Sequence, residues 1–569
     1  MTKTGLLSAL PDWETLSLRQ QIAQMIVVRA SGHLFDHQIE YPQWEAPHAV
    51  LQRSIQELGV GGVILLGGSA AEIGLRTQQL QDWAEIPLVI AADIEEGVGQ
   101  RFAGATWFPP PMALGQIARE DAALAVNLAL QMGKITAQEA KAIGLNWVLA
   151  PVVDVNNNPA NPVINVRSWG DTSELVGQLA AAFLQGAQSV SVLTTAKHFP
   201  GHGDTAIDSH LELPVIDHDL TRLQQIELPP FQQSIGAQVD AIMTAHIRLP
   251  ALDPIHPATL SRLILTGLLR QQMNFDGLIV TDALIMGAIL DRYGATAAPV
   301  MAVEAGADIV LMPADPEGAI DAICEAVETG RIPLTQIQAS LDRIWKAKQK
   351  VSDMPITGSS THDWERHTPP PIDLTQLARP EASETANVIL QHSTQIYRSN
   401  GDRLEQFLSQ RLIAALADRP APRNLILVDD ALNCGFLARS APAVTLPAEL
   451  GCSLQVLDRN TIGLLTAETN PPPTLLQLFI RGNPFRGSAG LTQTVQELVS
   501  RLIREDSASL GLFALVVYGS PYALESLATQ LPPDLPYGFS YGQRPAAQAI
   551  VLNRLFGNGQ QKQNQPFTD

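Results

Sequence analysis

The stretch VLTTAKHFPGHGDTAIDSH, residues 192–210, holds three histidines and joins a short apolar run to a polar loop. The run 192–198 has the length and composition of a buried strand, and it ends in a lysine and a histidine. Glycine and proline residues follow at once and indicate a loop. The stretch therefore predicts a strand whose carboxyl end carries functional side chains.

Seven further apolar runs have the same form, and helical segments lie between many of them. This alternation predicts an α/β fold with parallel strands, and eight such runs fit a (β/α)₈ barrel. A doubly wound open sheet is the alternative on pattern alone. The other runs lie at 24–30, 61–68, 87–94, 146–155, 241–247, 277–283 and 307–313.

Polar residues end several of these runs. In a parallel barrel the catalytic groups lie at the carboxyl ends of the strands, where the loops form a pocket. A structural role explains one such residue but explains five strand ends poorly, so the pattern predicts an active site. The residues are Asp93, Asp154, Lys197 with His198, His246 and Asp282.

The length of 569 residues predicts more than one domain. We expect a barrel over 1–350, a linker over 351–385 that is rich in Pro, Ser and Thr, and a smaller α/β sandwich over 386–569. Strand-like runs at 423–430, 474–482 and 512–521 and a helix-like segment at 488–506 support the second domain.

Charge and cysteine content exclude several classes of function. The net charge of −20 repels phosphate backbones, so we expect no nucleic-acid partner. The three cysteines are scattered and fit neither a disulfide framework nor a zinc site. No signal peptide and no membrane span are apparent, so the sequence predicts a soluble, cytoplasmic protein with no membrane partner.

Four segments together resemble the β-N-acetylhexosaminidases of glycoside hydrolase family 3. The resemblance covers about residues 15–350, with the motifs in the expected order, and it implies a barrel followed by a sandwich. It also implies a carbohydrate substrate and no cofactor or metal. The segments are LAPVVDVNNNPANPVINVRSWGD, AKHFPGHGDTAIDSH, MTAHI and IVTDALIMGAI.

The resemblance implies a role for each matching position. Asp282 matches the nucleophile that forms a covalent glycosyl-enzyme, although on local pattern alone it is equally well an N-cap of the next helix. Asp208 and His210 match the acid/base dyad, in which the imidazole transfers the proton and the carboxylate orients it. The matching sugar-binding positions are Asp93, Arg101, Arg167, Lys197 and His198.

The chain departs from the family pattern after Asp93. Where the family usually shows Glu-Gly-Gly-Arg, this chain has Glu95, Glu96, Gly97 and Val98, so a carboxylate replaces a glycine and a valine replaces an arginine. Asp93 and Arg101 stay in place, but the shape and charge of the loop differ.

Three other functions compete with a hexosaminidase. A metal-dependent barrel hydrolase is one, because His198, His202, Asp204, Asp208, His210 and His246 are of ligand type. A phosphorylase that uses phosphate in place of water is the second. The third is a carbohydrate sensor without catalysis. The resemblance favours removal of terminal β-linked N-acetylglucosamine from muropeptides of cell-wall turnover, with chitin oligosaccharides as the other substrate class.

Overall fold

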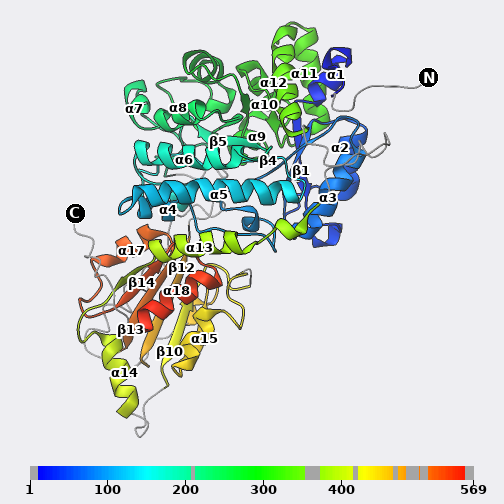
Figure 1. Ribbon diagram of the computed structural model, residues 1–569. Helices are drawn as coiled ribbons and strands as arrows, with labels where there is room; N and C mark the ends of the chain where they lie inside the picture. Colours follow the sequence, from blue (N-terminus) through cyan, green and yellow to red (C-terminus); the bar gives the residue numbers. More distant parts are fainter. Residues whose placement is uncertain are drawn as a thin grey trace. The chain divides into compact units, whose positions relative to one another are not determined.

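The computed structural model describes residues 10–206, 212–352, 372–413, 421–432, 434–464, 472–481, 499 and 511–557. The chain divides into two compact units (Figure 1). The first unit comprises Met1–Asn158 and Arg167–Ala386, and the second comprises Pro159–Val166 and Asn387–Asp569.

The first unit is built on an eight-stranded parallel sheet in the order β7-β6-β5-β4-β3-β2-β1-β8. A parallel bridge between Val280 and Ile309 joins β7 to β8 and closes the sheet into a barrel. The predicted (β/α)₈ barrel is thus confirmed, and an open sheet is excluded. The strands are β1 (Ile26–Ser31), β2 (Gly62–Leu66), β3 (Val89–Ala92), β4 (Trp147–Val148), β5 (Leu193–Phe199), β6 (Ala241–Thr244), β7 (Leu278–Val280) and β8 (Val310–Leu311).

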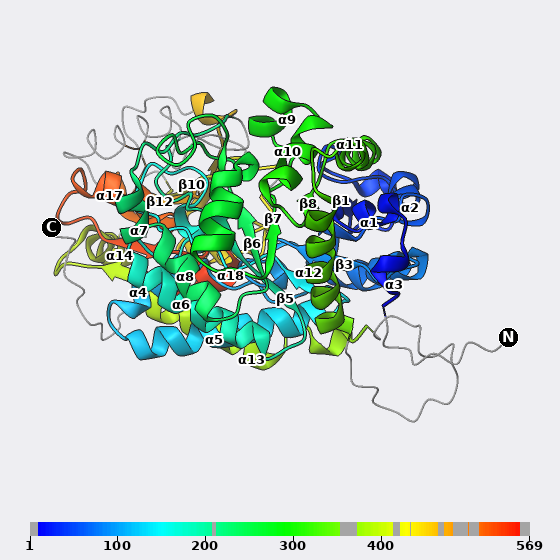
Figure 2. The ribbon, with the colours of Figure 1, turned by 90° about the horizontal axis from the view of Figure 1, so that it is seen from above.

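Helices surround these strands (Figure 2). Their starts follow local chemistry: the Ser69 hydroxyl accepts from the Glu72 backbone N–H while the Glu72 carboxylate accepts from Ser69 N–H, a capping box at the start of one helix. The helices are α1 (Leu18–Ala23), α2 (His48–Gln56), α3 (Ala70–Trp83), α4 (Met112–Ala118), α5 (Ala122–Ala142), α6 (Ser173–Gln188), α7 (Leu220–Gln225), α8 (Leu228–Gly236), the π-helix Leu263–Gln272, α9 (Gly287–Tyr293), α10 (Ala297–Ala305), α11 (Pro316–Glu328) and α12 (Leu334–Ser352).

Helix α12 packs across the amino ends of the strands. Lys348 Nζ donates to Gln24 Oε1, just before β1, and to the Pro87 carbonyl, just before β3, both at 2.7 Å. Lys350 pairs with Asp240, which directly precedes β6. This end of the barrel is therefore occupied, and the carboxyl ends of the strands lie at the opposite end.

Residues 372–386 pack along α5 in the first unit. The Asp373 N–H donates to the Ala142 carbonyl at 2.9 Å, the Ala378 N–H to Glu139 Oε1 at 2.7 Å and the Thr385 hydroxyl to Gln131 Oε1 at 3.1 Å. Of the expected linker, 353–371 lies outside the described residues, and the remainder includes the start of α13 (Pro380–Ser393).

The second unit contains a six-stranded sheet in the order β11-β10-β12-β13-β14-β9, in which only β9 is antiparallel to its neighbour. An α/β domain after the barrel is thus confirmed. Helix α18 contacts β14 and packs on α15. The strands are β9 (Gln395–Tyr397), β10 (Arg423–Leu427), β11 (Ser453–Leu457), β12 (Thr474–Ile480), β13 (Leu512–Gly519) and β14 (Tyr537–Ser540); the helices are α14 (Arg403–Ile413), α15 (Pro442–Glu449), α17 (Pro521–Ala528) and α18 (Pro545–Phe556).

Two expectations concern features beyond this core. The helix expected at 488–506 lies outside the described residues apart from Val499, which is helical. Within the part of the chain that the structure describes, no helix has the length and apolar character needed to cross a membrane.

Candidate active site

The carboxyl end of β5 brings two consecutive charged side chains into one cluster. The pairing of β5 with β6 shifts register between Lys197 and Phe199, so that His198 is an extra residue on its strand. Such a bulge changes the direction of a side chain that would otherwise point to the opposite face. Lys197 and His198 therefore both reach partners at the same end of the barrel.

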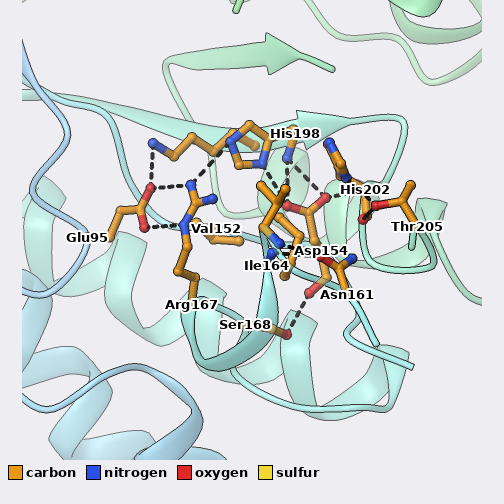
Figure 3. Close-up of polar contacts among 12 residues, drawn as sticks. Glu95, Val152, Asp154, Asn161, Ile164, Arg167, Ser168, His198, His202 and Thr205 are labelled. Atoms are coloured by element: carbon orange, nitrogen blue, oxygen red, sulfur yellow. Dashed lines mark hydrogen bonds and ion pairs between the residues drawn. The ribbon is translucent and has the colours of Figure 1, made fainter. Parts of the chain in front are cut away.

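Lys197 lies between two carboxylates from the loop after β3. Its Nζ is 2.6 Å from Asp93 Oδ1 and 2.7 Å from Glu95 Oε1. Arg167 binds both oxygens of Glu95 in a bidentate pair, in which Nε donates to Oε2 and Nη2 donates to Oε1, each at 2.8 Å (Figure 3). The Asp93 side chain remains one-third exposed (33%). The network therefore presents a carboxylate to solvent while its other members hold one another.

The charges in this network are stabilised by one another. Burial alone would raise the pKa of the Glu95 carboxyl, but Arg167 and Lys197 hold that pKa well below its usual range. Burial likewise opposes the charge on Lys197, and Asp93 with Glu95 reverses the effect and raises its pKa. The same balance raises the pKa of Arg167, where Glu95 outweighs burial. Glu95, Lys197 and Arg167 are therefore charged at neutral pH.

Asp154 organises the two histidines that follow the lysine. Its carboxylate accepts from the backbone N–H groups of His198 and His202 and lies 2.7 Å from His198 Nδ1. Burial opposes the charge on Asp154, but His198 lowers its pKa overall, so the carboxylate is ionised. Nδ1 of His198 therefore donates, and Nε2, 3.4 Å from Arg167 Nη2, is left as the acceptor (Figure 3).

Asp282 lies two residues beyond β7 at the same end of the barrel. Its side chain is half-buried, and Oδ1 accepts from the Ala283 N–H at 2.7 Å. The next helix, α9, begins at Gly287 with Met286 as its N-cap. The alternative role of Asp282 as the N-cap of that helix is therefore wrong.

Arg101 takes a different position from the other predicted sugar-binding residues. Its side chain is exposed, and Nε donates to the Asp93 backbone carbonyl at 3.0 Å. It thus holds the backbone of Asp93. The residues that the structure brings into one cluster are Asp93, Lys197, Arg167 and His198.

The predicted dyad, Asp208 and His210, lies outside the described residues. The loop before it is described as far as Ala206. In that loop, Thr205 Oγ1 lies 2.9 Å from His202 Nδ1, and Asp204 Oδ2 lies 2.8 Å from His218 Nε2. These contacts fix the chain directly before the dyad.

The residues suggested as metal ligands have other contacts. His198 binds Asp154, and His246 lies 2.8 Å from Thr259 Oγ1 and 3.1 Å from the Ala283 carbonyl. Over the described ranges, no group of three or more His, Cys, Asp or Glu side chains is arranged to hold a metal ion.

The sequence pattern gives Glu95 no role in the site, and it includes Asp154 only among the polar strand ends. Glu95 was noted only for the altered loop, yet it is the residue that joins Lys197 to Arg167. Its neighbour Glu96 is fully buried and accepts from Trp107 Nε1 at 2.8 Å. Asp154 follows an apolar run, as the other site residues do, and this signal was sufficient to find it.

Known proteins resemble this chain over both units. The family model described as Glycosyl hydrolase family 3 N terminal domain matches residues 17–347, and the Bacterial Glycosyl hydrolase family 3 C-terminal domain matches 416–557. A solved β-N-acetylglucosaminidase of glycoside hydrolase family 3 from Paenibacillus sp. str. FPU-7 is 28% identical with a TM-score of 0.73, covering 95% of this chain and 97% of that one.

Two relatives are named β-hexosaminidases. Beta-hexosaminidase A of Pseudoalteromonas piscicida is 37% identical over 333 residues, which is 53% of this chain and 55% of that protein. Beta-hexosaminidase of Nitrosomonas eutropha is 35% identical over 283 residues, 48% of this chain and 81% of that protein. The alignment thus spans about half the length of the first relative. With a family model matched over more than half of its length, the chain belongs to glycosyl hydrolase family 3.

Proposed function

We propose that this enzyme removes terminal β-linked N-acetylglucosamine from a carbohydrate substrate, by a retaining mechanism with Asp282 as the nucleophile. The observation that carries the proposal is the half-buried Asp282 carboxylate at the same barrel end as the Asp93–Lys197–Glu95–Arg167 network. The names of the relatives, β-hexosaminidase and β-N-acetylglucosaminidase, support the sugar.

The chemistry assigned to each group follows from its charge. The Asp282 carboxylate attacks the anomeric carbon and forms a glycosyl ester, which water then hydrolyses with overall retention. Asp93 accepts hydrogen bonds from sugar hydroxyls, and Lys197, His198 and Arg167 complete the pocket. Hydrogen bonds to ionised groups are about twice as strong as neutral ones, so a charged network suits this task.

The Asp208–His210 pair is proposed as the acid/base. An imidazole has an unperturbed pKa of roughly 6.5, so it can protonate the leaving group and then deprotonate water. The spacing of two residues and the position directly after the loop that His202 and Asp204 anchor support this assignment.

The natural substrate is proposed to be an N-acetylglucosaminyl muropeptide from peptidoglycan turnover, acted on in the cytoplasm. The family resemblance supports this choice, and the scattered cysteines suit a reducing compartment.

Hydrolysis of 4-nitrophenyl N-acetyl-β-glucosaminide tests the proposal, with the plain β-glucoside as the matched control. We expect strong preference for the hexosaminide, unchanged rates after EDTA treatment, and release of free sugar whether or not phosphate is present. The Asp282→Asn variant should lose nearly all turnover, because an amide neither attacks nor carries the charge. A fluorinated N-acetylglucosaminyl trap should label the peptide that contains Asp282.

Four other results of these assays would indicate a different function or a different nucleophile. A glycosyl phosphate as the product would make the enzyme a phosphorylase, and loss of activity with EDTA would indicate a metal. Absence of turnover on every hexosaminide would contradict the proposal. Labelling at another residue would move the nucleophile.

A further inference from the structure

Arg29, on β1, points into the barrel. It pairs in register with Ile64 of β2, which pairs with Ala91 of β3. Residues paired in a parallel sheet point to the same face, and side chains two apart on a strand do so too. Ala91 precedes Asp93 by two residues, so Arg29 points to the same side as Asp93.

The strands on the other side of β1 also indicate that Arg29 points into the barrel. Val27, two residues before Arg29, pairs with Leu311 of β8. Ile309, two residues before Leu311, bridges to Val280 of β7. Asp282 follows Val280 by two residues. By the same alternation Arg29 and Asp282 point to the same side of the closed sheet, its inside.

The register also sets the height of Arg29 in the barrel. When the register of each strand pair is extended once around the sheet from Arg29, the circuit returns to a position eight residues before Arg29, in line with β1. This offset of eight residues is the shear of a (β/α)₈ barrel. With this shear, each horizontal layer inside the barrel holds four side chains from alternate strands. From one of these strands to the next, the layer member lies two residues beyond the residue that the register pairs. The layer that contains Arg29 on β1 consists of Asp93 after β3, Lys197 on β5 and Asp282 after β7.

Three members of this layer already have a place in the proposed site. Asp93 is the partly exposed member of the ion network and pairs with the buried Lys197, and Asp282 is the proposed nucleophile. Arg29 is the fourth, opposite Lys197 and between the two aspartates in the order around the barrel. A sugar ring seated across the layer is therefore within reach of a cation on both sides.

Arg29 has no partner of its own among the described residues. Its side chain is half-buried, its Nε is buried without a hydrogen bond, and it forms no ion pair with Asp93 or Asp282. Burial lowers its pKa, and within the described part of the chain no carboxylate offsets this, as Glu95 does for Arg167. An inward-facing guanidinium without a partner is costly to hold unless a ligand supplies acceptors.

We propose that Arg29 is a sugar-binding residue, which donates hydrogen bonds to an oxygen of the N-acetylglucosamine ring bound over Asp282. This inference rests on the proposed function. Its physical basis is the layer that Arg29 shares with Asp93, Lys197 and Asp282, together with the missing partner.

Arg29→Met tests the proposal, because methionine keeps an unbranched stem and removes the guanidinium. We expect KM for 4-nitrophenyl N-acetyl-β-glucosaminide to rise about tenfold to a hundredfold, the worth of a hydrogen bond from a charged donor. In an Asp282→Asn background, calorimetry should show the same fold loss of affinity for free N-acetylglucosamine. Arg29→Lys should restore part of both. The matched control is Arg76→Met, since Arg76 is a buried arginine held by Gln79 and the His33 carbonyl; it should lower Tm and leave KM unchanged.

A comparison of the two substrates shows which sugar group Arg29 contacts. Loss on the hexosaminide alone assigns the acetamido group, and equal loss on the plain glucoside assigns a hydroxyl that both share. A wild-type enzyme that is active while Arg29→Met and Arg29→Lys keep the wild-type KM and affinity overturns the inference. A wild-type enzyme without hexosaminidase activity overturns the proposed function instead, and the affinity for N-acetylglucosamine then still decides the role of Arg29.

Discussion

At the scale of single residues, the arrangement of the site depends on which buried side chains are ionised. Glu95 holds two cations, and Asp154 holds the backbone and imidazole of His198. His202 is the contrasting case, because it is almost fully buried (1% exposed) and burial lowers its pKa to about 4, against the smaller opposing effect of Asp154. It is therefore neutral wherever the enzyme is folded at ordinary pH.

The buried His202 predicts an acid-sensitive fold. The unfolded chain protonates this histidine below about pH 6.5, whereas the folded chain does so only near pH 4, so the unfolded state binds more protons between these values. The free energy of unfolding should consequently fall as the pH drops, by about 1–2 kcal/mol between pH 6.5 and pH 5 from this group alone. Urea unfolding at several pH values measures the slope.

The variant His202→Asn should flatten that slope, and His392→Asn is the matched control because His392 is exposed on α13. An equal slope in wild type and His202→Asn would show that His202 is protonated in the folded enzyme. The carboxylates Glu95 and Asp154 act in a lower window, because their pKa values are depressed by folding and their contribution is lost only as the pH falls below the unfolded values.

The sequence pattern predicts some residues of the site and not others. Asp93, Lys197, His198 and Asp282 end apolar runs, and strand ends of a parallel barrel meet at one edge, so pattern alone brings them together. Glu95 lies on a loop and Arg167 ends a short 3-10 helix (Asn165–Arg167), and no periodicity in the sequence predicts the path of either segment. Arg29 lies inside an apolar run, and its membership of the layer emerges only from the register of all eight strands.

At the scale of elements, the strands of the barrel were predictable because each is buried on both faces and reads as a continuous apolar run. The second sheet shows the limit of that signal. Its central strands β10, β12 and β13 are buried throughout and were predicted, whereas β11 is a half-exposed edge strand and β9 has three residues. A short edge strand has too little apolar sequence to separate it from a loop.

Helices α5 and α6 show a close contact that sequence patterns did not reveal. A Cβ added at Gly133 of α5 would lie 2.0 Å from the Phe183 carbonyl oxygen of α6, and one at Gly186 of α6 would lie 1.9 Å from the Leu130 carbonyl oxygen of α5. The two glycines therefore let the backbones approach each other directly.

Gly133→Ala should destabilise the enzyme even though alanine favours helix by about 1 kcal/mol over glycine. The methyl group meets backbone, which must shift, so we expect a net loss of about 1–3 kcal/mol in the free energy of unfolding. Gly236→Ala is the matched control, because Gly236 ends α8 and an added Cβ there meets nothing within 4 Å. It should be neutral or stabilising, and a neutral Gly133→Ala would mean that α5 and α6 separate at little cost.

At the scale of the whole molecule, the chain ends its first unit later than composition suggests. The proline-rich stretch after α12 looks like the natural boundary, yet residues 372–386 return to α5 and belong to the first unit. Composition reports where a chain lacks apolar periodicity, but it does not report hydrogen bonds such as those of Asp373 and Ala378 to α5.

The boundary can be tested with two shortened chains, one that ends at Ala386 and one that ends at Ser352. Both contain every residue proposed for the site, so Tm is the informative measurement. The longer chain keeps the bonds of Asp373, Ala378 and Thr385 to α5, each worth on the order of 1 kcal/mol, and should unfold several degrees higher.

The variant Glu139→Gln distinguishes the contacts of residues 372–386 with α5 from a general effect of chain length on Tm. The Glu139 carboxylate accepts from the Ala378 N–H and also from the N–H and hydroxyl of Thr106, and burial raises its pKa. In the chain that ends at Ser352 the substitution affects only the Thr106 contacts, whereas in the chain that ends at Ala386 it also weakens the anchor of the returning segment. We therefore expect a larger fall in Tm in the longer chain. Equal falls in the two chains would show that residues 372–386 gain nothing from α5, and the boundary would then move back to Ser352.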